Sequence, residues 1–206
     1  MNRSLSLLTA LLLLSPAGVA ADEAAWQLLD SARQSLAEAS PLEAHFVQTY
    51  VPAGFSSGDR ESGRLYLSLP TCLRWDYEAP YPRSYMLCGR TVWSWAPDEP
   101  VGDRLLEVSR EEAGVDFLLL STERLRQRYD ARTDVEGDRR SVHLEPTSDD
   151  APFVRATIEL DPRTNRPRDI SYVDRQGNTT RFSLSDYTRP EDEAIFEPPD
   201  IDWIDG

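Results

Sequence analysis

Apolar and polar residues alternate along most of the chain after residue 40. Leu65, Leu67 and Leu69 occupy every second position of one segment, and Leu73, Trp75 and Tyr77 repeat the pattern in the next. Successive side chains of a strand point to opposite faces, so a period of two predicts strands with one dry face and one wet face. We expect about nine such strands, at residues 42–48, 64–69, 73–77, 83–88, 90–95, 141–145, 154–160, 169–174 and 181–186.

Two segments have helical spacing instead. Apolar residues recur at helical intervals from Trp26 to Ala39, where Pro41 ends the pattern, and again over 116–129. The second segment carries Arg124, Arg126 and Arg128 toward its C-terminal end, where positive charge suits the helix dipole. Many strands and few helices predict a mainly β (α+β) fold, a strongly curved antiparallel sheet forming an incomplete β-barrel with a small helical lid. Its dry face is either a plain filled core or an apolar cavity.

The first 21 residues have the layout of a cleavable signal peptide. A basic residue, Arg3, precedes an apolar run over 5–14, and a small-residue stretch ends at Ala20-Ala21. We expect export, cleavage at this point and a single mature domain over 22–206. No cysteine lies near the expected cleavage site to carry a lipid, so we expect a periplasmic protein without a lipid anchor.

The two cysteines, Cys72 and Cys88, are expected to form a disulfide bond. The segments 72–78 and 83–88 flank a turn that contains Pro80 and Pro82, and antiparallel pairing of the two would bring the cysteines close together. Disulfides are common in exported proteins, and the spacing is not that of a C-x-x-C redox motif. A structural bond is therefore the favoured interpretation over a redox site.

Charge and candidate chemistry exclude several functions. The formal net charge of −14 repels nucleic acid, which we do not expect as a partner. His45 and His143 stand alone, without metal-ligand spacing. The run from Gly54 to Gly58 fits G-x-S-x-G, but Pro52 precedes it and strand signals flank it, so it reads as a hairpin loop rather than a nucleophile elbow. We expect no enzyme activity, no metal and no cofactor.

The stretch from Gly63 to Pro97 contains a specific series of motifs. It reads Gly63-x-Leu65, Pro70, Leu73-Arg74-Trp75, Pro80 and then Gly89-Arg90-Thr91-Val92-Trp93-Ser94-Trp95-x-Pro97. In residue types and spacing it resembles the periplasmic outer-membrane lipoprotein carriers of the LolA family. Phe46-Val47-Gln48 is similar to the early Phe-x-Gln of that family, and Phe196-Glu197-Pro198-Pro199 to its closing element.

The resemblance implies an incomplete β-barrel under a helical lid. Its apolar cavity would shield the acyl chains of lipoproteins between an inner-membrane ABC-type release complex and an outer-membrane receptor, and we expect a monomer. The positions expected to line the cavity or the lid are Phe46, Leu65, Leu67, Leu69, Leu73, Trp75, Tyr77, Tyr85, Leu87, Trp93, Phe117, Leu118 and Leu120.

The chain also departs from the family pattern. Leu69 stands where the family has an arginine implicated in holding the lid closed, and Cys88 replaces an acidic residue. Lid control and cargo therefore stay open: the cargo is a lipoprotein or, as the alternative, another acylated or lipid product. A related receptor is disfavoured by the missing lipid-attachment cysteine. A lipid-sensing regulator of the same fold would carry a second domain, and an enzyme is the remaining rival.

Overall fold

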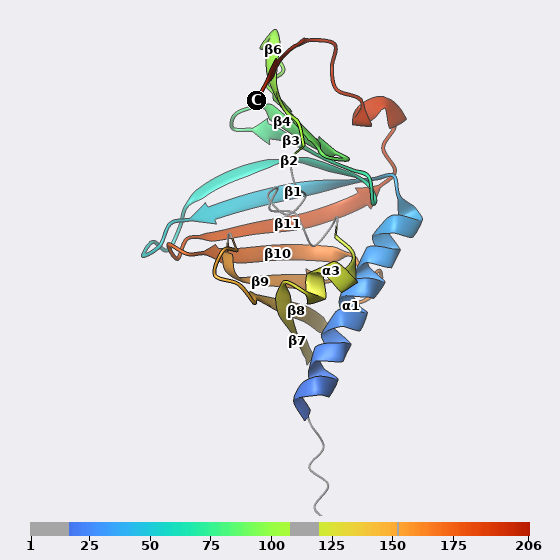
Figure 1. The fold of residues 1–206 in the computed structure, drawn as a ribbon, viewed down its shortest axis with the longest axis vertical. Helices are drawn as coiled ribbons and strands as arrows, with labels where there is room; N and C mark the ends of the chain where they lie inside the picture. Colours follow the sequence, from blue (N-terminus) through green and yellow to red (C-terminus); the bar gives the residue numbers. More distant parts are fainter. Residues whose placement is uncertain (1–16, 108–119, 152) are drawn as a thin grey trace, which may run out of the picture.

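The computed structural model of the protein describes residues 17–107, 120–151 and 153–206. Within these ranges, twelve strands form one sheet in the order β12-β6-β5-β4-β3-β2-β1-β11-β10-β9-β8-β7 (Figure 1). Neighbouring strands are antiparallel, except that β12 runs parallel to β6. The strands are β1 (Leu42–Val51), β2 (Asp59–Ser68), β3 (Cys72–Ala79), β4 (Arg83–Cys88), β5 (Thr91–Trp95), β6 (Val101–Leu105), β7 (Tyr129–Glu136), β8 (Arg139–Pro146), β9 (Phe153–Leu160), β10 (Pro167–Asp174), β11 (Thr179–Thr188) and β12 (Asp202–Asp205).

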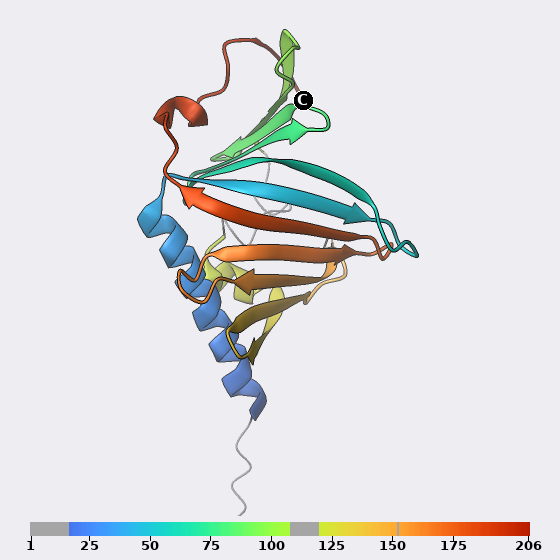
Figure 2. The same cartoon turned by 180° about the vertical axis from the view of Figure 1, so that it is seen from behind.

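This sheet confirms the predicted fold class. It is mainly β, open at both edges and curved, as the views from front and back show (Figures 1 and 2). Each of the nine predicted strands is present, and β6, β7 and β12 are additional. The expected number of strands was therefore too low. We call the face of the sheet on which the first helix packs the inner face, and the opposite one the outer face.

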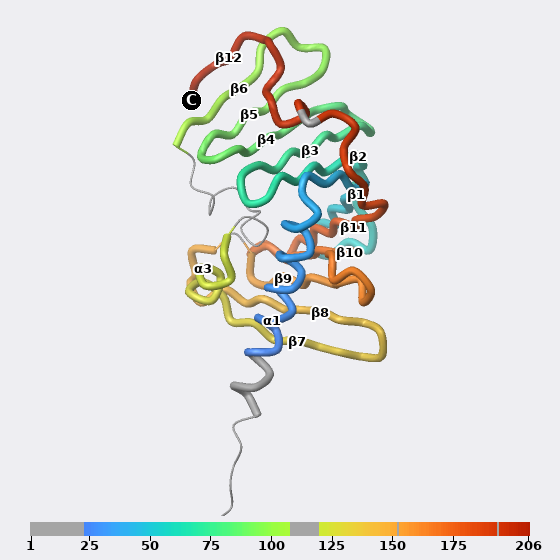
Figure 3. The backbone as a smooth tube through the Cα atoms, turned by 90° about the vertical axis from the view of Figure 1, so that its right-hand side faces the viewer, coloured from blue at the N-terminus to red at the C-terminus, as the bar shows by residue number. Residues whose placement is uncertain are grey.

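Helix α1 (Ala17–Ala39) supplies the apolar stripe that the sequence predicts. Ala25, Trp26, Leu29, Ala32 and Leu36 are buried at helical intervals and pack against the inner face. The helix contacts β7 and β8, which it crosses in Figure 3. It ends at Ala39, before Pro41, as predicted. The expected signal peptide overlaps the first residues of α1, and its first 16 residues lie outside the described ranges.

The second helical segment is shorter than expected. Within the described part of the predicted range 116–129, the helix α3 covers only Thr122–Arg126, and Tyr129 already begins β7. The ring of Tyr129 turns to the inner face and stacks on Phe153 at 5.5 Å between centroids. This aromatic contact favours a strand over further helix, so the prediction of a helix through residue 129 was wrong.

Two polar contacts attach α3 to α1. The Thr122 hydroxyl donates to the Asp30 carboxylate, and the Arg126 guanidinium binds Glu23 through two hydrogen bonds of 2.9 and 3.0 Å. Arg126 also lies over the Trp26 ring, 5.2 Å from its centroid. The arginine thus joins two helices in addition to lying in the last turn of α3.

The C-terminal segment covers part of the outer face. It contains a short 3-10 helix, η1 (Glu193–Phe196), before β12 completes one edge of the sheet. Arg74 of β3 donates through Nη1 to the Ile195 carbonyl at 2.7 Å. Trp203 of β12 meets Trp95 edge to face at 6.1 Å and packs against Gly102, where an added Cβ would lie 2.5 Å from the indole. Glycine at position 102 therefore allows the tail to pack closely.

Candidate functional site

An aliphatic band runs across five strands of the inner face. Its members are directly opposite one another in the register of the sheet: Leu42 pairs with Leu67, Leu67 with Leu73, Leu73 with Leu87, and Leu87 with Val92. Residues that pair in this way point to the same face. The four leucines are buried and Val92 is half-buried. This band lies at the end of β1 next to α1, since Leu42 is the first residue of the strand.

An aromatic cluster follows the aliphatic band farther along the strands. It consists of Phe46, Trp75, Tyr77, Tyr85 and Phe182. Phe46 is buried and meets both Trp75 and Tyr77 edge to face at 5.0 Å, while Tyr85 meets Tyr77 at 6.0 Å. Trp75, Tyr77 and Phe182 are half-buried, and Tyr85 is 40% exposed. The cluster therefore presents large apolar surfaces that the protein's own atoms cover only in part.

The contact between Trp75 and Phe182 shows how tightly the sheet curls. Trp75 is on β3 and Phe182 on β11, with β2 and β1 between them. In a flat sheet their strands would lie about 14 Å apart, three spacings of about 4.8 Å. Their ring centroids are nevertheless 5.0 Å apart. The two side chains reach toward each other above the intervening strands, as on the concave side of a partial barrel.

Gly63 makes room for this cluster. It lies opposite Phe46 on one side and Tyr77 on the other, and the rings of these two residues meet across it. A Cβ at position 63 would lie 1.9 Å from the Asp76 carbonyl oxygen, so the backbone tolerates only glycine here without shifting. A register irregularity between Ser62 and Gly63 marks a β-bulge, which increases local twist.

A polar cluster ends the apolar surface at the far side from α1. It consists of Gln48, Glu61 and Arg83 together with the Tyr77 hydroxyl. Arg83 pairs with Tyr77 in register and Glu61 with Gln48, so all four face inward. Arg83 donates to both carboxylate oxygens of Glu61 at 2.8 and 2.9 Å, and its guanidinium carbon lies 4.0 Å from the Tyr77 ring centroid. The pair is partly buried, with 30% and 21% of the two side chains exposed.

The protonation states of this cluster follow from its surroundings. Burial raises the pKa of the Tyr77 phenol above its ordinary value, so the hydroxyl stays protonated and donates to Gln48 Oε1 at 2.6 Å. Hydrogen bonding to Glu61 raises the pKa of the Arg83 guanidinium, so Arg83 stays a cation. The inner face thus changes along the strands from aliphatic to aromatic to polar but uncharged overall.

The structure brings most of the predicted cavity residues together on the inner face. Leu69, just beyond β2, is half-buried against the same core, and its N–H donates to Ser40 Oγ at 3.0 Å. Leu120 is buried beside α3. Phe117 and Leu118 lie outside the described residues. The predicted residues that share the inner face or its core are Phe46, Leu65, Leu67, Leu69, Leu73, Trp75, Tyr77, Tyr85, Leu87 and Leu120.

Trp93 is the exception, and its assignment to the cavity was wrong. It pairs with Met86, which pairs with Arg74, whereas its neighbour Val92 pairs with Leu87. Trp93 therefore points to the outer face, and Val92 takes the inward position. Trp93 was assigned to the cavity because it is apolar. Counting the alternation of faces from the inward residue Leu87 through the hairpin to β5 would have placed Trp93 on the outer face.

Three apolar residues of the inner face were missed as site candidates. Leu42 and Val92 complete the two ends of the aliphatic band, and Phe182 belongs to the aromatic cluster. The alternation of Thr180, Phe182 and Leu184 in β11 carried a signal for Phe182. Glu61 and Arg83 carried no such signal, since charged residues are typical of the solvent-exposed ends of hairpins.

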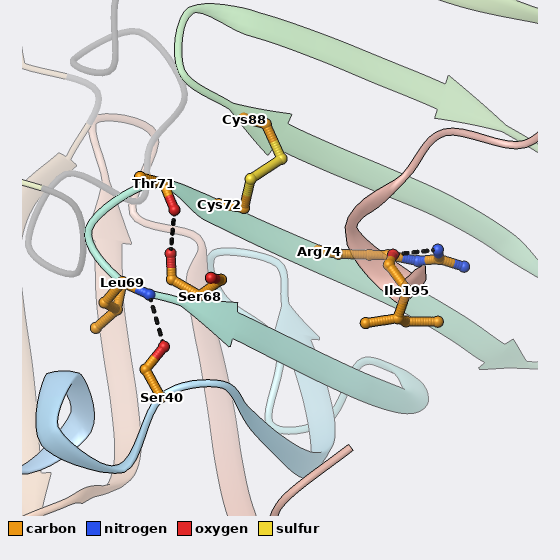
Figure 4. The surroundings of a disulfide bond; sticks show 8 residues. All are labelled: Ser40, Ser68, Leu69, Thr71, Cys72, Arg74, Cys88 and Ile195. Atoms are coloured by element: carbon orange, nitrogen blue, oxygen red, sulfur yellow. Dashed lines mark hydrogen bonds between the residues drawn. A yellow bond between two sulfur atoms is a disulfide. The ribbon is translucent and has the colours of Figure 1, made fainter. Parts of the chain in front are cut away.

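The predicted disulfide is present. Cys72 and Cys88 are directly opposite in the register of β3 and β4 and form the bond, with their Cα atoms 4.2 Å apart (Figure 4). Cys72 precedes Leu73 and Cys88 follows Leu87. Both cysteines therefore point to the outer face, away from the aliphatic band. Nearby, the Thr71 hydroxyl donates to the Ser68 carbonyl at 2.8 Å, which fixes the turn between β2 and β3.

Other candidate chemistry finds no support in the described parts of the chain. The G-x-S-x-G run lies in the turn between β1 and β2, with Gly54 in the left-handed region at φ 82°, so it is a hairpin loop as predicted. Residues 17–107, 120–151 and 153–206 contain no group of His, Cys, Asp and Glu that could hold a metal ion. Of the helices in those ranges, none combines the length and apolar character needed to cross a membrane.

Solved structures share this architecture. An uncharacterized conserved protein from Thermus thermophilus superposes with a TM-score of 0.60 at 12% identity, covering 89% of this chain and 99% of that one. A chain of the Pseudomonas aeruginosa MucA/MucB complex gives 0.50 at 11% identity, over 85% of this chain and 61% of that one. At these identities the likeness shows the fold alone.

Sequence comparison is more specific. The outer-membrane lipoprotein carrier protein of Xylella fastidiosa (strain Temecula1) is 29% identical over 151 residues, which are 72% of this chain and 71% of the relative. That of Shewanella woodyi is 27% identical over 206 residues, 97% of this chain and 94% of the relative. The model of the family described as outer membrane lipoprotein carrier protein LolA matches residues 37–198. The chain belongs to the LolA family.

Proposed function

We propose that this protein carries lipoproteins through the periplasm by binding their acyl chains on the inner face of the sheet. It receives them from an inner-membrane ABC-type release complex and delivers them to an outer-membrane receptor. Membership of the LolA family supports the class of cargo. The disulfide between Cys72 and Cys88 is in keeping with an oxidising compartment.

The partly exposed aromatic cluster is the observation that carries this proposal. Phe46 is buried, because the rings of Trp75, Tyr77 and Phe182 surround it. Trp75, Tyr77 and Phe182 keep part of their surface accessible on a concave face. Broad rings contact apolar chains of varied shape without requiring one fixed geometry. An acyl chain is a suitable guest for such a surface.

The aliphatic band sets a limit on how tightly the guest is held. Each buried methylene contributes about 0.8 kcal/mol, so a dozen of them would contribute about 10 kcal/mol and make release very slow. Leu42, Leu67, Leu73 and Leu87 are already buried in the protein as it stands. A guest must separate them from their neighbours, and that work offsets part of the binding energy. Binding is then strong enough for transport and weak enough for delivery.

The test compares two tryptophans on β3 and β5, the strands on either side of β4. Trp75→Glu places a charge on the inner face, and Trp93→Glu places the same charge on the outer face as a matched control. Binding of an apolar fluorescent probe, 1-N-phenylnaphthylamine, should be lost in the first variant and retained in the second. Circular dichroism establishes that both variants fold, and Phe182→Ala serves as a milder inner-face variant. Equal probe binding by folded Trp75→Glu and wild type would refute this site.

The cargo is identified by what the protein carries. Mass spectrometry of the protein purified from the periplasm should find acylated lipoproteins, and Trp75→Glu should lack them. An acylated product other than a lipoprotein would support the alternative that this chain is a specialised carrier. Leu69, which packs against the core where the family has an arginine, is the residue that favours that alternative.

A further inference from the structure

The inner face is amphipathic along the direction of its strands. Beginning next to α1, the order on β1 is Leu42, Phe46 and Gln48, and β4 repeats it with Leu87, Tyr85 and Arg83. Leu42 and Gln48 are six residues apart, about 20 Å along a strand, close to the length of an extended palmitoyl chain. A guest whose hydrocarbon lies on the aliphatic band therefore has its polar end beside Glu61 and Arg83.

Glu61 and Arg83 determine the charge of that end. The two-bond contact between them cancels one full charge against the other. A guanidinium has five N–H donors. Glu61 accepts two hydrogen bonds from Arg83, and the Tyr81 carbonyl accepts another at 3.3 Å. The cluster therefore offers hydrogen bonds to neutral oxygen acceptors while Glu61 repels a second anion.

We propose that the Arg83–Glu61 pair makes the inner face selective for ester- and amide-linked acyl chains over free fatty acids. This inference rests on the proposed function and adds the chemical class of the linkage. Ester and amide carbonyls accept hydrogen bonds from Arg83 without displacing Glu61. A fatty-acid carboxylate must compete with Glu61 for the same guanidinium, and it meets a carboxylate of like charge.

Removing Glu61 should shift this preference toward palmitate, and removing Arg83 should not. Glu61→Gln keeps the shape of the side chain but leaves Arg83 with an uncompensated charge at the polar end of the face. Palmitate should then bind roughly tenfold more tightly than to wild type, because a charge-assisted hydrogen bond replaces a repulsion. Arg83→Gln leaves Glu61 unpaired and should weaken palmitate binding. The double variant Glu61→Gln/Arg83→Gln restores neutrality and should show no gain.

Asp205→Asn is the matched control. Asp205 binds Arg104 through two hydrogen bonds of 2.6 and 2.9 Å at the β12 edge, remote from the polar cluster in the strand order. The substitution changes the net charge of the protein by the same amount as Glu61→Gln. Palmitate binding should stay at the wild-type level if the position of the charge, rather than the total charge, decides selectivity.

Displacement of 1-N-phenylnaphthylamine measures all these affinities, with palmitate and a dipalmitoyl ester-linked cysteine peptide as competitors. The ratio of the two affinities should change in Glu61→Gln, whereas a purely structural role of the pair would move both together. An unchanged ratio in Glu61→Gln and in Arg83→Gln, with probe binding intact, overturns the inference. Failure of the wild-type protein to bind the probe would instead refute the proposed function itself.

Discussion

Breaking the Cys72–Cys88 disulfide should lower the free energy of unfolding by about 3 kcal/mol. The two cysteines are 16 residues apart in the sequence. In the chain-entropy model a closed loop of that length restricts the unfolded chain by about 3 kcal/mol at 25 °C. The folded protein should change little, because the register of β3 and β4 continues beyond the bond through Leu73 and Leu87. For a domain of this size the loss corresponds to about 6–12 °C in Tm.

Equilibrium unfolding in urea, followed by tryptophan fluorescence, checks this magnitude. The wild-type protein is measured with and without dithiothreitol, and the double variant Cys72→Ser/Cys88→Ser under both conditions. The variant should match the reduced wild type and should not respond to the reductant. A loss below about 1 kcal/mol would refute the loop-closure argument.

The same variant also tests the placement of the bond. Cys72 and Cys88 point away from the aliphatic band. The double variant should therefore still bind the fluorescent probe at urea concentrations well below its lowered unfolding midpoint. If binding disappeared while the protein stayed folded, the disulfide would be shaping the inner face directly, in contradiction to the register of β3 and β4.

Two further predictions concern single residues. Gly63→Ala should lower the free energy of unfolding by about 1–3 kcal/mol, because the added Cβ would meet the Asp76 carbonyl oxygen. Ser62→Ala, the control, should change it by about 0.5 kcal/mol or less. Urea unfolding distinguishes the two variants, and equal losses would contradict the close approach at Gly63. Stability should fall above pH ~10, the ordinary pKa of tyrosine, because burial raises the pKa of Tyr77 and that of Tyr187, and an ionised phenol favours the unfolded chain. The sequence contains no lysine that would titrate in the same pH range. The urea midpoint of unfolding should therefore change less between about pH 8 and about pH 11 in Tyr77→Phe than in the wild-type protein. An equal change in the two proteins would argue against burial of the Tyr77 phenol.

The sequence was sufficient to predict the strands that alternate strongly, and it failed where the signal was short or mixed. β6 contains Gly102 and β12 has four residues, so neither offers enough alternation to stand out. In β7, Tyr129 and Ala131 point inward, but this strand begins soon after α3 ends. The prediction of a helix was therefore extended into residues that form the strand. A strand that depends on its neighbours for hydrogen bonds is not encoded by its own residues alone.

A bulge reverses the faces at the start of β9, where the sequence gives no sign of it. Simple alternation over 154–160 places Val154 on the inner face, yet Val154 is 46% exposed and Phe153 packs inward instead. The register of β9 and β10 is irregular at this point, between Val173 and Asp174, and one extra residue reverses the parity beyond it. No feature of the local sequence marks this bulge, because Phe and Val are both apolar and both favour strands.

The polar end of the inner face shows most clearly what a sequence alone does not provide. Glu61 and Arg83 are 22 residues apart and belong to strands that are not neighbours, since β3 lies between β2 and β4. Their contact requires the register of two strand pairs, the bulge beside Gly63, and the Tyr77 ring on which Arg83 lies. These conditions join residues that are far apart in the sequence, as does the curl of the sheet that brings Trp75 to Phe182. Residue types and spacing therefore predict a curved, apolar face, whereas its polarity gradient, and with it the choice of guest, follows only from the assembled sheet.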